Sequence, residues 1–279
     1  MKLCYNQATT LENSNLETDL KLCEKHGYDY IEIRTMDKLP EYLETNSMED
    51  LASYFENNHI KPLAMNALVF FNNRTGEEHR ESIKEFKDML EKAKQINAPY
   101  IVAVPLVTEE KILQADIKKS AVSVLQEFSE LAEPYGIKIA VEFVGHPQCT
   151  INTFGQAYDI VEAVGRDNVG LVLDCFHFHA MGSKMQDLKK ANGNKIFIIH
   201  IDDTEDFPIG FLTDEDRVWP GHGAIDLQGV ITTALERGFD GAVSVELFRP
   251  EYYKLDPDKV IKKAKDTSLE VLNHIQVKN

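Results

Sequence analysis

Short apolar runs alternate with longer segments of helical spacing along this chain, and few folds are compatible with that alternation. Eight runs rich in β-branched residues recur, at residues 3–5, 30–33, 63–68, 100–104, 137–143, 169–173, 196–201 and 242–245. The segments between them place apolar residues at helical intervals, as Leu16, Leu20 and Cys23 do. The run 196–199 is apolar at every position, which is typical of strands buried on both faces of a parallel sheet.

Eight β-α units in succession predict an α/β protein, a single (β/α)8 TIM barrel. A doubly wound open sheet more usually has five or six strands, and no G-x-G-x-x-G or G-x-x-x-x-G-K motif follows the first run. The chain has 279 residues and no Gly/Ser-rich or Pro-rich linker. We therefore expect residues 1–279 to form one TIM-barrel domain.

The charge of the chain restricts its partners. With 46 acidic and 30 basic residues the formal net charge is −16, which repels phosphate backbones and anionic membrane surfaces. No basic stretch followed by an apolar one opens the sequence, so we expect no membrane or nucleic-acid partner and a cytoplasmic location. The four cysteines form no C-x-x-C pair, which argues against a disulfide framework or a thiolate zinc site.

Four successive strands end in side chains that can bind a metal: Glu142, Asp174, His200 and Glu246. The carboxyl ends of the strands in a barrel converge on one rim, so these side chains would become neighbours. A carboxylate at the end of a buried strand is unfavourable unless it is paired or binds a cation. The alternative is four separate strand-end residues, each making its own hydrogen bond or surface ion pair. We favour a shared site for one divalent metal.

Three carboxylates and one imidazole suit a hard or borderline cation. We expect Zn²⁺ or Mn²⁺, with Mg²⁺ or Co²⁺ as alternatives. The absence of thiolate ligands argues against a purely structural zinc. Asp202, two residues after His200, is the predicted partner of that histidine. The only long irregular segment, residues 202–226, follows the seventh predicted strand and is a candidate lid or substrate wall.

Several motifs together resemble the xylose-isomerase-like superfamily of sugar isomerases and epimerases. They are Glu142, Asp174-x-x-His177, His200-Ile-Asp, Arg217 followed by Pro220-Gly221-x-Gly223, and Glu246. Beyond these motifs the chain is similar to the inosose isomerase family of myo-inositol catabolism, over segments 23–34, 67–73, 142–149 and 201–221. Because these segments come from all regions of the predicted barrel, the resemblance is specific.

The resemblance implies a metal-dependent isomerase that converts 2-keto-myo-inositol into 1-keto-D-chiro-inositol. It assigns Glu142, Asp174, His200 and Glu246 as metal ligands. His177 and Arg217 match positions that hold substrate oxygens in related ketose epimerases. Those epimerases typically carry glutamate where this chain has Gln148, so a substrate contact by Gln148 is the assignment that departs from the family pattern.

Moving a carbonyl to the neighbouring carbon requires removal of an α proton, a stabilised enediolate and return of a proton one carbon over. A metal-bound enediolate would place the developing charge on oxygens that face a dication. Glu142 and Glu246 are the predicted catalytic acid and base, and either can take either part. A metal-assisted hydride shift would use the same residues and stays open.

Other functions remain alternatives on the same residues. A ketose sugar epimerase or isomerase, or an inosose dehydratase, would use the same metal site. A nuclease of the endonuclease branch would need a further histidine after Asp216-Arg217, where this chain has Val218. A polyol-binding barrel without catalysis would lack a ligand or an acid–base residue, and neither is missing. The predicted partner is a small polyhydroxy ketone, and we expect a homo-oligomer because barrel enzymes of this size commonly self-associate.

Overall fold

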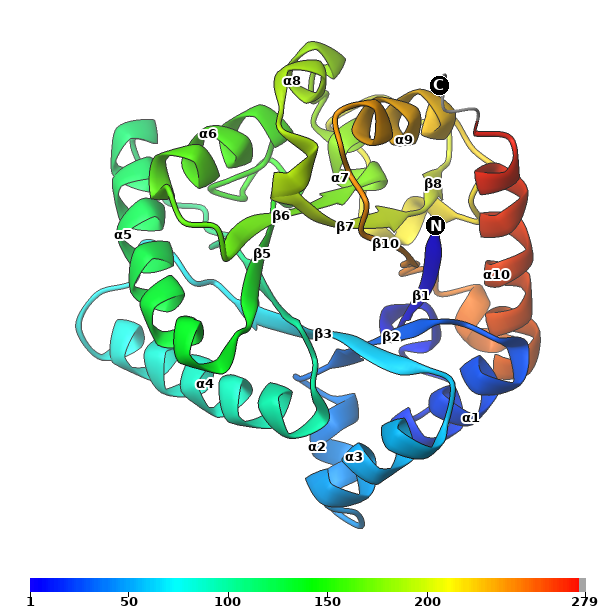
Figure 1. The fold of residues 1–279 in the computed structure, drawn as a ribbon. Coiled ribbons are helices and arrows are strands. Elements are labelled where there is room, and N and C mark those ends of the chain that lie inside the picture. Colours follow the sequence, from blue (N-terminus) through cyan, green and yellow to red (C-terminus); the bar gives the residue numbers. More distant parts are fainter. Residues whose placement is uncertain (276–279) are drawn as a thin grey trace.

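The computed structural model describes residues 1–275, and its centre is a closed barrel of eight parallel strands (Figure 1). Neighbouring strands follow the order β1-β10-β7-β6-β5-β4-β3-β2 around the barrel. Their bounds are β1 (Lys2–Asn6), β2 (Tyr30–Arg34), β3 (Lys61–Val69), β4 (Tyr100–Val104), β5 (Lys138–Glu142), β6 (Val169–Asp174), β7 (Ile196–Ile201) and β10 (Ala242–Val245). Each predicted run lies at one of these strands, so the predicted (β/α)8 barrel is confirmed.

Helices surround the barrel on the outside, as Figure 1 shows. Their bounds are α1 (Leu16–His26), α2 (Lys38–Leu43), α3 (Met48–Asn57), α4 (Gly76–Ile96), α5 (Gln114–Ala132), α6 (Phe154–Val164), α7 (Cys175–Ala180), α8 (Met185–Lys190), α9 (Leu227–Glu236) and α10 (Pro257–Asn273). Short 3-10 turns are η1 (Gln7–Thr10), η2 (Glu133–Tyr135), η3 (Gly193–Lys195), η4 (Asp214–Asp216) and η5 (Tyr252–Lys254). Within the described chain, none of the helices is both long and apolar enough to span a membrane.

Local chemistry fixes where helices begin and end. The side chain of Asn15 accepts a hydrogen bond from the backbone N–H of Thr18 and so caps α1. The same helix ends at Gly27, whose φ of 71° lies in the left-handed region that glycine adopts without a steric penalty. Asn97 ends α4 in the same conformation, with φ of 60°. These ends lie at the turn signals that the sequence carries.

Apolar side chains fill the barrel in two layers. The larger cluster lies between strands and helices and includes Leu20, Phe86 and Ile199. A second cluster draws on β1, β3 to β7 and β10, and includes Ala140 and Ile198. Alternate residues of a strand face the same side of the sheet. Glu142 and His200 therefore lie on the same face as Ala140 and Ile198, which precede them by two positions. The strand ends are thereby aimed at one common region.

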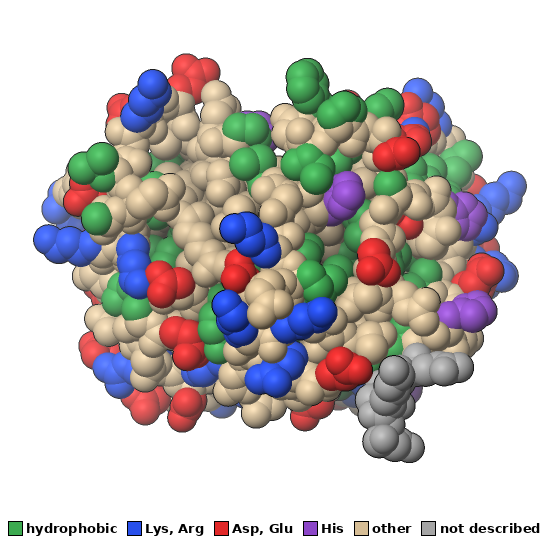
Figure 2. Space-filling view, turned by 90° about the horizontal axis from the view of Figure 1, so that it is seen from above, with side chains coloured by type: hydrophobic (Ala, Val, Ile, Leu, Met, Phe, Trp, Pro, Cys, Tyr) green, Lys and Arg blue, Asp and Glu red, His purple; other side chains and the backbone are tan. Residues whose placement is uncertain are grey.

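Charged side chains of both signs are mixed on the side of the molecule drawn in Figure 2. Red acidic and blue basic groups lie between tan and green ones, and the blue groups do not form one continuous patch there. The formal charge of −16 therefore coexists with scattered cations on this side.

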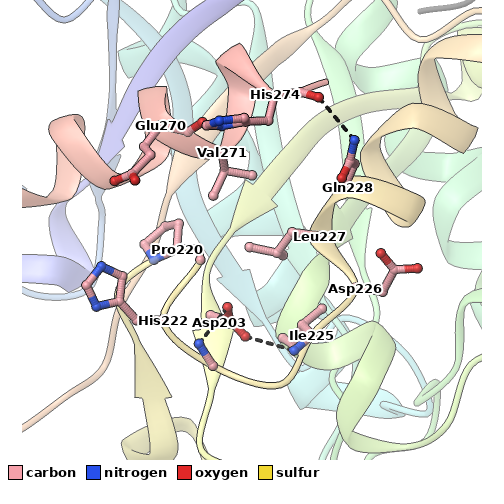
Figure 3. A pocket seen from close by; sticks show the side chains of 12 residues that line it. Asp203, Pro220, His222, Ile225, Asp226, Leu227, Gln228, Glu270, Val271 and His274 are labelled. Atoms are coloured by element: carbon pink, nitrogen blue, oxygen red, sulfur yellow. Dashed lines mark hydrogen bonds between the residues drawn. The ribbon is translucent and has the colours of Figure 1, made fainter. Parts of the chain in front are cut away.

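Residues 202–226 are more ordered than the sequence analysis expected. They contain a two-stranded antiparallel sheet of β8 (Asp203–Thr204) and β9 (Arg217–Val218). Asp203 anchors the segment, because its carboxylate accepts hydrogen bonds from the backbone N–H groups of Gly223 and Ile225, each at 2.9 Å (Figure 3). The expectation of an irregular segment is thus corrected, and the sheet provides a fixed support for Arg217.

A buried polar network ties η1 to α1. Asp19 is fully buried, and its carboxylate accepts hydrogen bonds from Gln7 Nε2 at 2.8 Å and Thr10 Oγ1 at 3.0 Å. Burial raises the pKa of Asp19 to about 6, and the two hydrogen bonds only partly oppose that effect. An unfolded aspartate titrates near pH ~3.9.

Replacing Asp19 by Asn should change how stability depends on pH. Between about pH 4 and pH 6 the folded protein keeps a proton that the unfolded chain has released, so the wild-type free energy of unfolding falls as pH rises. The pKa of Asp19 differs by about two units between the folded and unfolded states, which corresponds to about 3 kcal/mol in the free energy of unfolding. We expect Asp19→Asn to gain about that much relative to wild type between pH 4 and pH 7, measured by urea unfolding. A difference that stays constant with pH would contradict the assignment, and Asp88→Asn on the surface is the control.

Candidate metal centre

The four residues predicted from the strand ends lie together at one end of the barrel. These residues are Glu142, Asp174, His200 and Glu246. Each offers one ligand atom, and the four ligand atoms all lie within 4.8 Å of one another. All four side chains are buried. Within residues 1–275 it is the only group of His, Cys, Asp and Glu that meets this condition.

Strand register explains why these residues meet. Asp174 ends β6 and lies directly opposite His200 on β7. His200 is in turn opposite Ser244 on β10, two residues before Glu246. Glu142 ends β5, which is the neighbour of β6 on the other side. Parallel strands with this register bring all four side chains to the carboxyl end of the barrel, as the sequence analysis expected.

The distances within the group fit a shared cation. His200 Nδ1 lies 2.8 Å from Glu142 Oε1, 3.1 Å from Glu246 Oε2 and 3.6 Å from Asp174 Oδ2. Glu142 Oε1 is buried and has no hydrogen-bond partner, although the imidazole nitrogen is so close. A buried carboxylate oxygen without a donor is unfavourable. The oxygen and the nitrogen instead face a point at which a cation could accept both lone pairs.

The electrostatics of the group also favour a cation. Burial raises the pKa of Glu142 above its ordinary value, against the opposing effect of His200. Burial lowers the pKa of His200, but Glu246, Glu32 and Glu142 outweigh burial and raise it well above its ordinary value. The neighbouring carboxylates contribute to both shifts, because they add to the effect of burial on Glu142 and are the main raising cause for His200, and together they form an excess of buried negative charge. A divalent cation at this point would neutralise that excess.

Asp174 joins the group to a short helix. Its Oδ1 accepts a hydrogen bond from the backbone N–H of His177 at 2.6 Å and so caps α7. Its Oδ2 faces the ligand group and lies 2.9 Å from Arg217 Nη1. Burial alone would raise the pKa of Asp174, but Arg217 holds it well below its ordinary value. One carboxylate thus fixes both the ligand group and the helix that carries His177.

Arg217 enters the site from β9 and is fully buried. Its guanidinium pairs with Asp174 and Asp202 through Nη1, and Nη2 lies 2.9 Å from Asp214 Oδ1. The guanidinium carbon lies 4.6 Å from the centre of the Phe176 ring. These contacts fix the plane of the guanidinium, so its N–H groups are already oriented before any ligand binds.

His177 lies beside Arg217, whereas Gln148 lies apart. His177 Nε2 is 3.2 Å from Arg217 Nη2, and its Nδ1 is buried without a hydrogen-bond partner. Gln148 is exposed on the loop after β5 and lines a different cavity, together with Thr108 and Asn152. The structure therefore groups His177 and Arg217 with the four ligand candidates and does not bring Gln148 to them. A substrate contact by Gln148 stays a prediction.

Sequence reasoning assigned the wrong partner to His200. Its second ring nitrogen, Nε2, lies 3.0 Å from Glu32 Oε1, whereas Asp202 binds Arg217 and the backbone N–H of Phe176. Asp202 is close to His200 in sequence but lies beyond the end of β7, so strand alternation no longer sets where its side chain points.

Three supporting residues on the early strands were also missed. Asn6, at the end of β1, donates a hydrogen bond to Glu246 Oε1 at 2.8 Å. Glu32 and Asn66, on β2 and β3, are likewise buried and bonded to each other at 3.1 Å. A signal was present, because each of these polar residues lies within or at the end of an otherwise apolar strand. Glu32 alternates with Ile31 and Ile33 in the sequence, which is compatible with an internal ion pair as well as with a substrate contact and does not identify His200 as its partner.

A separate cavity of about 350 Å³ lies between the Pro220–Gly223 turn and the end of α10. Figure 3 shows His222, Glu270 and His274 around it. None of the four ligand candidates lines this cavity. Its size therefore does not identify it as the reactive site.

Comparison with known proteins agrees with the fold. The model of the xylose isomerase-like TIM barrel family matches residues 20–271. An inosose isomerase of Halalkalibacterium halodurans is 70% identical over 273 residues, which are 98% of this chain and 97% of that protein. An inosose isomerase of Bacillus subtilis is also 70% identical over 273 residues, 98% of each chain.

One of the similar solved structures contains a metal. The crystal structure of the IolI protein with a bound zinc atom is 67% identical and covers 100% of both chains, with a TM-score of 0.98. The chain described here belongs to the xylose isomerase-like TIM barrel family, in the branch that contains the inosose isomerases.

Proposed function

We propose that this protein is a divalent-metal-dependent isomerase that converts 2-keto-myo-inositol into 1-keto-D-chiro-inositol. The observation that carries the proposal is the buried group of Glu142, Asp174, His200 and Glu246, in which a carboxylate oxygen lacks any hydrogen-bond donor. The 70% identity to inosose isomerases supports the choice of substrate. The zinc atom of the IolI structure supports Zn²⁺ as the metal, with Mn²⁺ as the alternative.

The four side chains would hold the cation, which would act as a Lewis acid toward the carbonyl oxygen and the neighbouring hydroxyl oxygen of the substrate. The residues of the chain supply the remaining requirements. Glu142 and Glu246 reach the site from different strands, so one can take a proton from the carbon next to the ketone. The same proton or another is then returned to the former carbonyl carbon, and a hydroxyl proton moves to the other oxygen. The substrate and its product are isomers, so no oxidant or reductant is needed.

Arg217 and His177 are the proposed substrate-binding residues. Each nitrogen of the Arg217 guanidinium contacts a protein acceptor, namely Asp174, Asp202, Asp214 or His177, so a substrate oxygen would share or replace one of these contacts. The free Nδ1 of His177 is the second polar atom at the site that lacks a partner. Both side chains are buried, which keeps water away from an enediolate. A cytoplasmic location and a homo-oligomer stay predictions.

Zinc should stabilise the protein, and Glu142→Gln should reverse the order of stabilities. At free zinc about 1,000 times the dissociation constant, binding adds about 4 kcal/mol to the free energy of unfolding. Without metal, Glu142→Gln should unfold at the same temperature as wild type or higher, because it removes a buried charge beside Glu246 and Asp174. With zinc, wild type should be more stable than the variant. Differential scanning calorimetry with zinc and with chelator measures both.

The surface variant Glu127→Gln is the matched control, since Glu127 is exposed on α5, pairs with His79 and is not one of the ligand candidates. It should gain as much stability from zinc as wild type does. If zinc stabilises Glu142→Gln and wild type equally, Glu142 is not a ligand.

Isomerisation should be visible directly in D₂O. We expect zinc-loaded protein to convert 2-keto-myo-inositol into a new ketoinositol that carries deuterium at the carbon that receives the proton, measured by ¹H NMR. The physical reason is that a proton held by a glutamate can exchange with solvent before it returns. Chelator should stop the reaction.

Product without deuterium would count against the proton-transfer route and favour a hydride shift on the same residues. If zinc binds but 2-keto-myo-inositol is unchanged, the proposed substrate is wrong, and ketose sugars are the next substrates to assay.

A further inference from the structure

Glu32 is a buried carboxylate that the proposed reaction does not use. It lies on β2, is fully buried, and its Oε1 is 3.0 Å from His200 Nε2. The strands β2 and β7 are distant in sequence, and this contact joins two residues that are 168 positions apart along the chain. A carboxylate at such a depth requires partners, and the imidazole of His200 is one of them.

The two ring nitrogens of His200 face different surroundings. Nδ1 points to the carboxylates of Glu142 and Glu246, and Nε2 points to Glu32. A neutral imidazole carries one proton, and an ionised carboxylate can only accept a hydrogen bond. With a cation among the carboxylates on the Nδ1 side, Nδ1 would carry no proton, and a neutral His200 would then have its proton on Nε2, where Glu32 accepts it. That arrangement leaves the lone pair of Nδ1 directed at the ligand group.

Glu32 is itself held in place. Asn66 Nδ2 donates a hydrogen bond to Glu32 Oε2 at 3.1 Å, so each oxygen of the carboxylate has one partner. The register of β2 and β3 pairs Arg34 with Asn66, two positions beyond Glu32. Asn66 is itself buried, with 7% of its surface exposed. Two polar contacts thus connect Asn66 on β3 through Glu32 on β2 to His200 in the ligand group.

We propose that Glu32, held by Asn66, is a positioning residue that fixes the tautomer and the ring orientation of His200, so that Nδ1 is free to bind the metal. The inference rests on the proposed metal centre. Glu32 contacts neither the metal position nor the substrate, and it acts only through His200. Carboxylate partners of metal-bound histidines typically change metal affinity by about 10–100-fold when they are removed.

The test uses the variants Glu32→Gln and Asn66→Ala in the full chain. Because Asn66 donates to Oε2, the new amide in Glu32→Gln would place its carbonyl oxygen there and its NH₂ group against His200 Nε2. An NH₂ donor favours a proton on Nδ1, which blocks that atom as a ligand. We expect the zinc dissociation constant of Glu32→Gln to rise about 10–100-fold. Asn66→Ala, which leaves the Glu32 charge in place, should raise it by a smaller factor.

Asp19→Asn is the matched control. Asp19 is also a fully buried carboxylate with two side-chain donors, but its partners are Gln7 and Thr10. The zinc affinity of the Asp19→Asn variant should equal that of wild type, measured by competition with a chromophoric chelator. Circular dichroism verifies that each variant is folded, and Asn66→Ala tests the proposal if Glu32→Gln does not fold.

Ring ¹⁵N NMR of the zinc-loaded proteins supplies a readout that a loss of stability would not change. The His200 signals are assigned by their absence in His200→Gln. In wild type we expect the proton on Nε2 and the metal-bound shift on Nδ1. In Glu32→Gln we expect a second population of His200 without the metal-bound shift.

Two outcomes are decisive, and they are distinguishable. If wild type binds zinc and Glu32→Gln binds it within twofold of wild type, with unchanged ring shifts, Glu32 is not a positioning residue. If wild type itself binds no zinc, the proposed metal centre fails, and the inference about Glu32 fails with it.

Discussion

The burial of several carboxylates at one end of the barrel is the constraint on which the rest of the site depends. Glu142, Asp174 and Glu246 lie around one imidazole nitrogen, and Arg217 brings a permanent positive charge to two of them, Asp174 and Glu246. Such a concentration of charge is unfavourable without a cation, because desolvation and mutual repulsion both act against the ionised forms. These carboxylates lie at the carboxyl ends of the strands, which is where barrel enzymes have their catalytic residues.

The surrounding contacts orient the charges. Asn6 holds one oxygen of Glu246, and Glu32 holds the outer nitrogen of His200. Asp174 divides its two oxygens between the end of α7 and Arg217. Each ligand candidate except Glu142 is thus restrained by a further side chain or helix end. A site restrained in this way needs little rearrangement when a cation or a polyhydroxy ketone binds, which is a requirement of efficient electrostatic catalysis.

Local patterns in the sequence were sufficient to predict the fold and the four ligand candidates. Eight apolar runs at regular intervals leave few alternatives to a parallel barrel, and the bounds of the strands differ from the predicted runs by at most a few residues. The four ligand candidates were identifiable because each ends an apolar run, such as the one before Glu142. Both inferences depend on local pattern, since alternation and strand ends are properties that neighbouring residues carry.

Only the tertiary structure decided which side chains support the ligands. Glu32 and Asn66 lie on strands that are distant from His200 in sequence, and nothing local pairs them with it. Asp202, the neighbour in sequence, faces Arg217 instead. The exposed position of Gln148 and the small sheet that carries Arg217 were equally beyond local reasoning. The physical reason is that a hydrogen-bond partner is set by the closure and register of the barrel, and these depend on packing across the whole chain.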